Sequence, residues 1–117
     1  MKTKAEMRKL FIGIRDTCKN PKFEEISGNL YSKGDEYSRI HRVLDETGTL
    51  DYDYADNLGN RNGYELARTP ENLTFKDCST ALTFLLRAER FSEGAFTEAL
   101  KDGTVYKLLS RMVETLP

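Results

Sequence analysis

The sequence has only one histidine, two cysteines and no tryptophan in 117 residues. Cys18 and Cys78 lie far apart and form no Cys-x-x-Cys pair. Two such cysteines do not make a disulfide framework, and a zinc site built on the lone His41 would need unusual carboxylate help. We therefore expect two buried thiols in a reducing cytoplasm, a half-buried histidine, no metal and no cofactor.

The sequence also lacks a long apolar run, a strong net charge and any nucleotide-binding or catalytic signature. A membrane-spanning helix needs about 20 apolar residues, and no stretch approaches that. The net charge is −1, from 18 basic and 19 acidic residues, whereas duplex-binding domains are usually strongly basic. Neither a glycine-rich phosphate loop nor a G-x-S-x-G elbow occurs. We expect a cytoplasmic protein without a membrane partner.

What the chain does have is helical periodicity over most of its length. Thr3 and Glu6 match a capping box ahead of the first helix, which Asn20-Pro21 ends. Residues 20–34 are rich in glycine and predict a loop, with a short helical turn at 23–26. At this length, one domain is expected. The sequence predicts an all-α bundle of five or six helices spanning residues 1–117.

The strongest helical signal is a segment at about 74–90, introduced by Thr74-x-x-Asp77. Apolar residues cover more than half of its circumference, which is typical of a helix at the centre of a fold. Ser92 is predicted to cap a helix over 92–101.

Thr104 is predicted to cap the last helix, over 104–115. Its apolar arc is wider than one neighbour requires, so this helix either inserts between two others or pairs with a second copy. We hypothesise self-association as a homodimer through this helix. We reject a DNA-binding helix-turn-helix motif in this C-terminal region, because Glu98 and Asp102 occupy positions where that motif requires apolar residues.

A local signature, Arg87-x-x-Arg90-Phe91-Ser92-x-Gly94, follows the central helix. Residues 87–112 resemble the end of a bacterial domain-of-unknown-function family that carries an Arg-x-x-Arg-Phe-x-x-Gly motif. Residues 37–54 resemble its upstream stretch, with tyrosine where that family has tryptophan. The resemblance implies an all-helical fold and no assigned activity, so no functional residue is carried over.

Glu89 falls inside the apolar stripe of the central helix, and a carboxylate buried there alone would be costly. It precedes the predicted helix 92–101, whose free N–H groups favour an anion. We predict that Glu89 satisfies those groups, with Arg87 or Arg90 as a salt-bridge partner. The alternative is an enzyme with dispersed residues around Glu89, including the two arginines and His41.

The same segment offers one weak binding site, for an anion or a partner, consisting of Arg87, Arg90, Ser92 and Gly94. A glycine in the first turn of a helix allows close approach of a neighbouring helix or of a ligand. Phe91 is predicted to pack against Phe96 as a hydrophobic staple.

Two charged clusters complete the candidates. A group of acidic and amide side chains resembles a calcium-binding loop: Asp51, Asp53, Asp56 and Asn57. The residue types at key positions of such a loop do not match, so we expect a solvated acidic turn. The first helix carries a basic edge. It consists of Lys4, Arg8, Arg15 and Lys19.

The leading hypothesis is a protein-interaction or regulatory module without catalytic activity, whose partner is another protein or a second copy. Nucleic-acid binding through the basic edge is the alternative, and near-zero net charge disfavours it.

Overall fold

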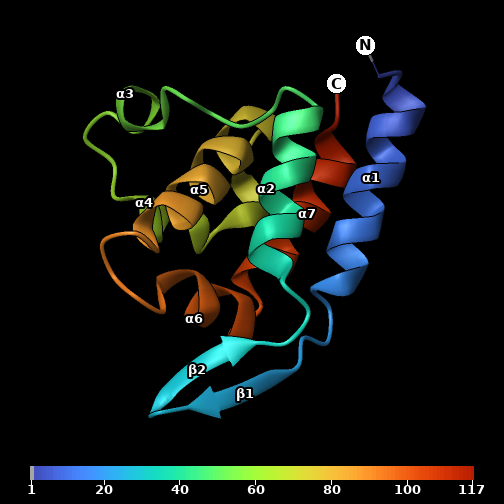
Figure 1. Ribbon diagram of the computed structural model, residues 1–117. Coiled ribbons are helices and arrows are strands. Elements are labelled where there is room, and N and C mark those ends of the chain that lie inside the picture. Colours follow the sequence, from blue (N-terminus) through green and yellow to red (C-terminus); the bar gives the residue numbers. More distant parts are fainter. Residues whose placement is uncertain (1) are drawn as a thin grey trace.

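The computed structural model describes residues 2–117 (Figure 1). This part of the chain contains seven α-helices, one 3-10 turn and a two-stranded sheet. In chain order the elements are α1 (Lys4–Thr17), β1 (Phe23–Ile26), β2 (Asn29–Ser32), α2 (Glu36–Glu46), α3 (Tyr54–Leu58), α4 (Gly63–Ala67), η1 (Pro70–Asn72), α5 (Phe75–Ala88), α6 (Ala95–Lys101) and α7 (Thr104–Thr115). The mainly helical prediction is confirmed, but the fold is not purely all-α and has more helices than the five or six expected.

Two predicted helix starts are confirmed by their hydrogen bonds. The Thr3 hydroxyl accepts from the Glu6 N–H, and the Glu6 carboxylate accepts from the Thr3 N–H, which completes the capping box of α1. The Thr74 hydroxyl likewise accepts from the Asp77 N–H at the start of α5. Local side-chain chemistry therefore sets where both helices begin.

The core forms where α7 packs against α1, α5 and α6, and Figure 1 shows α7 behind α2, in the middle of the molecule. Its apolar arc is buried: Val105, Leu108, Leu109, Met112, Val113 and Leu116 are each at most 8% exposed. Neighbours within the chain therefore account for the width of the arc, by insertion between other helices. Self-association stays a prediction, but the width of the apolar arc of α7 no longer supports it.

The predicted central helix is confirmed as α5, which contacts α3, α4, α6 and α7. Eight of its residues are buried, including polar Ser79, Thr80 and Thr83. A close approach of α4 is possible only because Gly63 has no side chain, since a Cβ there would lie 2.5 Å from the Phe84 ring. The Tyr64 ring meets the same Phe84 ring edge-on at 4.9 Å.

The predicted loop at 20–34, with a helical turn at 23–26, is wrong, because the chain forms an antiparallel hairpin there and residues 23–26 are its first strand. Phe23 pairs with Ser32 and Ile26 with Asn29. The connecting residues Ser27 and Gly28 have φ of 53° and 85°, and two positive values in a two-residue loop match the twist of the strands. An isolated hairpin is marginal in water, and this one is held by Phe23 against the core and by β2 against α6.

The start of α7 also differs from the prediction. Gly103, with φ of 89°, is the residue before the helix, and Thr104 is already its first residue. The left-handed backbone that ends the preceding turn requires glycine there, so no threonine cap forms.

Candidate functional site

Glu89 joins the end of α5 to the beginning of α6. One carboxylate oxygen accepts from the Gly94 N–H at 2.7 Å, and the other accepts from the Phe96 N–H at 3.1 Å. The predicted role of Glu89 at the N-terminus of the following helix is confirmed. The predicted salt bridge is wrong, because no ion pair among residues 2–117 joins Glu89 to Arg87 or Arg90. With both oxygens engaged by backbone donors, this carboxylate is poorly placed to shuttle protons.

Because Glu89 binds these two N–H groups, α6 begins later in the chain than the sequence predicts. Gly94 has φ of 94° and precedes α6, which begins at Ala95. The prediction that Ser92 caps a helix over 92–101 is therefore wrong. The predicted packing of Phe91 against Phe96 is wrong as well, because Phe91 is 88% exposed. Phe96 instead meets the Tyr37 ring edge-on at 5.3 Å.

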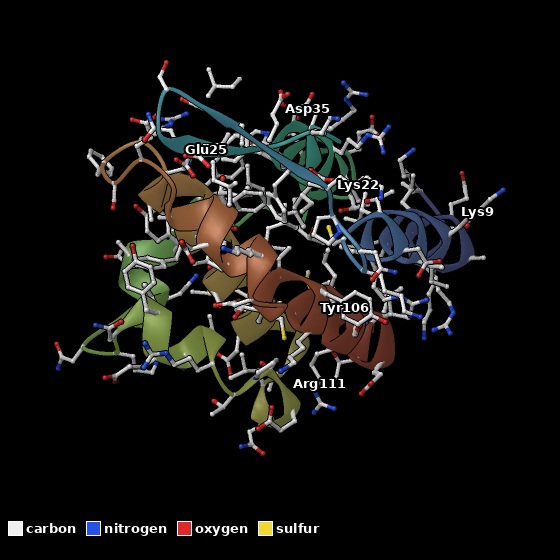
Figure 2. All side chains as sticks on the ribbon, turned by 90° about the horizontal axis from the view of Figure 1, so that it is seen from below. Lys9, Lys22, Glu25, Asp35, Tyr106 and Arg111 are labelled. Atoms are coloured by element: carbon white, nitrogen blue, oxygen red, sulfur yellow. The ribbon has the colours of Figure 1, made fainter. Side chains whose placement is uncertain are left out.

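Between the hairpin and α6 lies a cleft of about 720 Å³, which we call the hairpin cleft. Its walls come from β2 and the segment leading into α2 on one side, and from residues 92–98 on the other. Figure 2 views this end of the molecule from below, with Glu25 on the hairpin and Asp35 near the start of α2. Because two distant segments form its walls, the cleft exists only in the folded chain.

The hairpin cleft is lined by more acidic than basic side chains. Its carboxylates belong to Asp35, Glu89, Glu93 and Glu98, and the one base among its lining residues is Lys33. The Tyr31 hydroxyl donates to the Glu93 carboxylate at 3.2 Å and so links the two walls. Neighbouring carboxylates of one sign favour a cation between them.

Aromatic and aliphatic side chains complete the hairpin cleft. Tyr37, one of its lining residues, is half-buried, and its hydroxyl donates to the Leu86 carbonyl at 3.0 Å. Tyr31, which lines the cleft, is 39% exposed, and two large apolar side chains close in sequence to lining residues are also exposed: Phe91 by 88% and Ile26 by 52%. Exposed aromatic groups beside charged ones are typical of a surface that binds another protein.

The structure separates the predicted binding residues. Ser92 and Gly94 line the hairpin cleft, whereas Arg87 and Arg90 are not among its lining residues. The backbone donors expected to bind an anion there are occupied by Glu89. His41, on α2, is half-buried and likewise absent from the cleft walls.

The predicted basic edge of α1 is partly used within the chain. The Arg8 guanidinium donates to the Val113 carbonyl near the end of α7, and the Arg15 guanidinium pairs with Asp16 at 3.0 Å. Lys4 and Lys19 are exposed. Two of the four cations therefore have structural partners, which weakens the basis for phosphate contacts along this edge.

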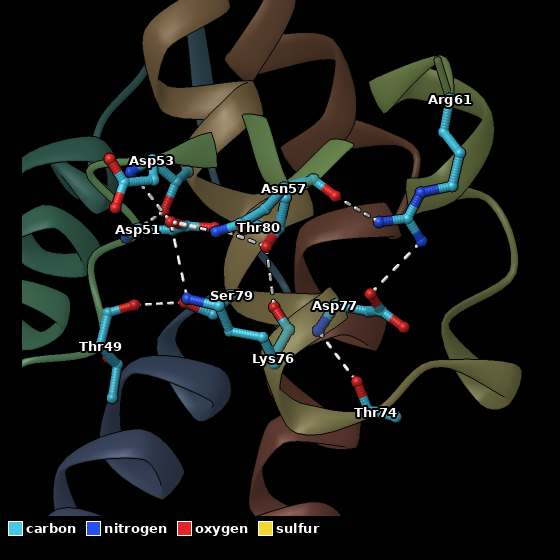
Figure 3. Close-up of polar contacts among 11 residues, drawn as sticks. Thr49, Asp51, Asp53, Asn57, Arg61, Thr74, Lys76, Asp77, Ser79 and Thr80 are labelled. Carbon is cyan, nitrogen blue, oxygen red and sulfur yellow. Dashed lines mark hydrogen bonds and ion pairs between the residues drawn. The ribbon is translucent and has the colours of Figure 1, made fainter. Parts of the chain in front are cut away.

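A second polar cluster centres on Asp51, shown in Figure 3. Its carboxylate accepts from the Thr80 hydroxyl at 2.6 Å, from the Asn57 amide at 2.9 Å and from the Asp53 N–H at 3.0 Å. The Lys76 ammonium lies 3.6 Å away. Asp51 thereby fastens the segment between α2 and α3 to the middle of α5.

The expected solvated acidic turn is therefore wrong at Asp51, which is only 3% exposed. Burial alone would raise the pKa of this carboxyl, but the hydrogen bonds from Thr80 and Asn57 and the Lys76 charge together lower it. Among the described residues, no group of three potential ligands is placed to hold a metal ion. Asp53 and Asp56 remain exposed, as predicted for that turn.

Both cysteines are buried and free of disulfide bonds, as predicted. Burial raises the pKa of Cys18 to about 11 and that of Cys78 to about 12. Both thiols thus stay protonated at neutral pH, which makes them poor nucleophiles. Among residues 2–117, no helix has the length and apolar character needed to cross a membrane.

Sequence reasoning missed most of the hairpin cleft, including Tyr31, Glu93 and Glu98. The signal that could have revealed one wall is Ser27-Gly28, a turn dipeptide flanked by two short segments with aromatic and aliphatic residues. The opposite wall depends on the path of the chain between α5 and α6, which no local pattern indicates.

Fold and cleft together define a small helical domain in which a β-hairpin forms one wall of an acidic, aromatic hollow. The chain belongs to a family of unknown function, DUF6508, whose model matches residues 7–116. Searches of curated proteins and of solved structures find no match. The match shows a family of unknown function, as the resemblance implied, and assigns no activity.

Proposed function

We propose that this chain is a protein-interaction module that binds a basic segment of a partner in the hairpin cleft. The observation that supports it is the combination of carboxylates along the walls with the exposed Tyr31 among them, next to Phe91, which is exposed one residue before the lining residue Ser92. A lysine or arginine side chain offers a cation for the carboxylates and an aliphatic stem for the aromatic faces. Guanidinium groups suit this site best, because they both stack and donate to several oxygens.

Glu93 and Glu98 are the side chains best placed to discriminate such a partner. Both are exposed, and neither is buried in the core where a substitution would disturb packing. Glu93→Gln also keeps an oxygen that can accept from the Tyr31 hydroxyl, so the link between the walls is retained. Asp35 has φ of 54°, a conformation that asparagine tolerates, so Asp35→Asn removes charge without adding backbone strain.

The proposal is tested by titrating the full chain with a blocked peptide of alternating arginine and leucine, followed by nuclear magnetic resonance. We expect chemical-shift changes concentrated in residues 28–37 and 89–98. The double variant Glu93→Gln/Glu98→Gln should weaken binding about threefold to tenfold, as expected for two exposed ion pairs. Added salt should weaken it further.

The matched control is a peptide with glutamate in place of each arginine, which should not shift these resonances. Equal binding of the two peptides, or no response in these segments at about millimolar arginine peptide, would refute the proposal. Glu65→Gln serves as the control variant, because Glu65 is exposed on α4 and does not line the cleft.

A further inference from the structure

A second hollow lies between α1 and α2 and has the opposite electrostatic character. This helix groove has a volume of about 710 Å³, and Leu10, Ile14 and Val43 contribute its apolar side chains. Its basic residues are Lys2, Lys9, Arg39 and Arg42, and its acids are Glu6 and Glu46. Figure 2 places Lys9, on α1, on the other side of the molecule from Glu25 of the hairpin.

The basic side chains of the helix groove have no partner within the described chain. No ion pair or side-chain hydrogen bond in residues 2–117 involves Lys2, Lys9, Arg39 or Arg42. The Glu6 carboxylate is occupied in the capping box of α1. With four basic side chains against Glu6 and Glu46, the lining of the helix groove carries a net positive charge beside its apolar side chains.

Gly13 supplies an independent observation. It stands inside α1 and lines the helix groove, and a Cβ built on it would meet nothing within 4 Å. Its backbone is ordinary helix rather than left-handed, so neither packing nor conformation within this chain calls for glycine. Glycine inside a helix stabilises the helix less than alanine does. A common reason for a glycine there is that it allows another backbone to approach closely.

We propose that the helix groove docks an acidic amphipathic helix of a partner protein, whose small and apolar face packs over Gly13, Leu10 and Val43. Its acidic flanks face Lys9 on α1 and Arg39 and Arg42 on α2. A helix laid into a groove between two helices is an established mode of recognition, read through apolar residues at helical spacing. The partner proposed for the helix groove is acidic, whereas the partner proposed for the hairpin cleft is basic. The two proposals can therefore be tested independently.

The test uses the full chain and a blocked helical peptide with a leucine and alanine face and glutamate flanks. We expect binding that perturbs the amide resonances of residues 9–17 and 39–46 and leaves the hairpin cleft unchanged. Arg39→Glu/Arg42→Glu should weaken binding about tenfold or more, because attraction becomes repulsion at two positions. A peptide with lysine in place of every glutamate should not bind.

Gly13→Leu separates docking from a structural role. The leucine side chain would enter the open groove, so the thermal midpoint should be unchanged or higher while peptide binding is lost. Binding that survives Gly13→Leu, or the absence of binding at about millimolar peptide, would overturn the proposal. Binding of anionic lipid vesicles in preference to the peptide would also overturn it, since it would make the groove a membrane contact.

Discussion

Replacing Asp51 with alanine should lower the free energy of unfolding by about 2–4 kcal/mol, because hydrogen bonds to a charged group are strong and this buried carboxylate accepts them from three residues. Thr80 is 1% exposed, and its hydroxyl would lose the carboxylate and keep only the Lys76 carbonyl, 3.0 Å away, as an acceptor. The loss should appear in chemical denaturation as a lower midpoint. Asp53→Ala is the matched control and should change stability by at most about 0.5 kcal/mol, since Asp53 is exposed.

Because Asp51 is charged, its contribution to the free energy of unfolding depends on pH. Because its folded-state pKa is lowered, the carboxylate stabilises the fold above the ordinary value of 3.8, and this stabilisation is lost as pH falls through the folded pKa. The difference in stability between the native chain and Asp51→Asn should therefore shrink below that value. A difference that stays constant down to strongly acidic pH, or equal effects of Asp51→Ala and Asp53→Ala, would contradict the role assigned to Asp51.

Replacing Leu109 with alanine should lower the free energy of unfolding by about 2–5 kcal/mol, the range for a fully buried leucine. Leu109 is 0% exposed, on the helix that packs against α1, α5 and α6. Lys107→Ala, on the exposed side of the same helix, is the control.

Protein concentration separates packing within one chain from pairing between copies. If α7 is buried within a single chain, the unfolding midpoint of Leu109→Ala and of the native chain should not depend on concentration. A small effect of Leu109→Ala, together with midpoints that rise with concentration, would instead favour the dimer hypothesised from the sequence.

The features that could be predicted are those that neighbouring residues determine. Thr3 with Glu6, and Thr74 with Asp77, identify helix starts because each pair exchanges bonds within one turn. The role of Glu89 could be predicted because a buried acid just before another helix has few possible hydrogen-bond partners other than the N–H groups of that helix. The burial of α7 followed from the apolar spacing of its residues.

The features that were missed depend on contacts between distant segments. Strands of four residues, one of them holding Glu24 and Glu25, carry little hydrophobic alternation, so the hairpin was predicted as a loop. The burial of Asp51 depends on Thr80, which lies on α5, 29 residues further along the chain. Phe91 is exposed because the capping by Glu89 shifts the start of α6 past the position that a staple requires.

The hairpin cleft is the centre of this account, and reversing its charge tests it most directly. The double variant Glu93→Lys/Glu98→Lys should lose the arginine peptide and bind the glutamate peptide instead. The melting profile should stay close to that of the native chain, because both side chains are exposed and the Tyr31–Glu93 hydrogen bond that is lost is also exposed. Such an inversion of preference is the predicted result. If the variant still prefers the arginine peptide as the native chain does, the carboxylates of the hairpin cleft do not select its partner.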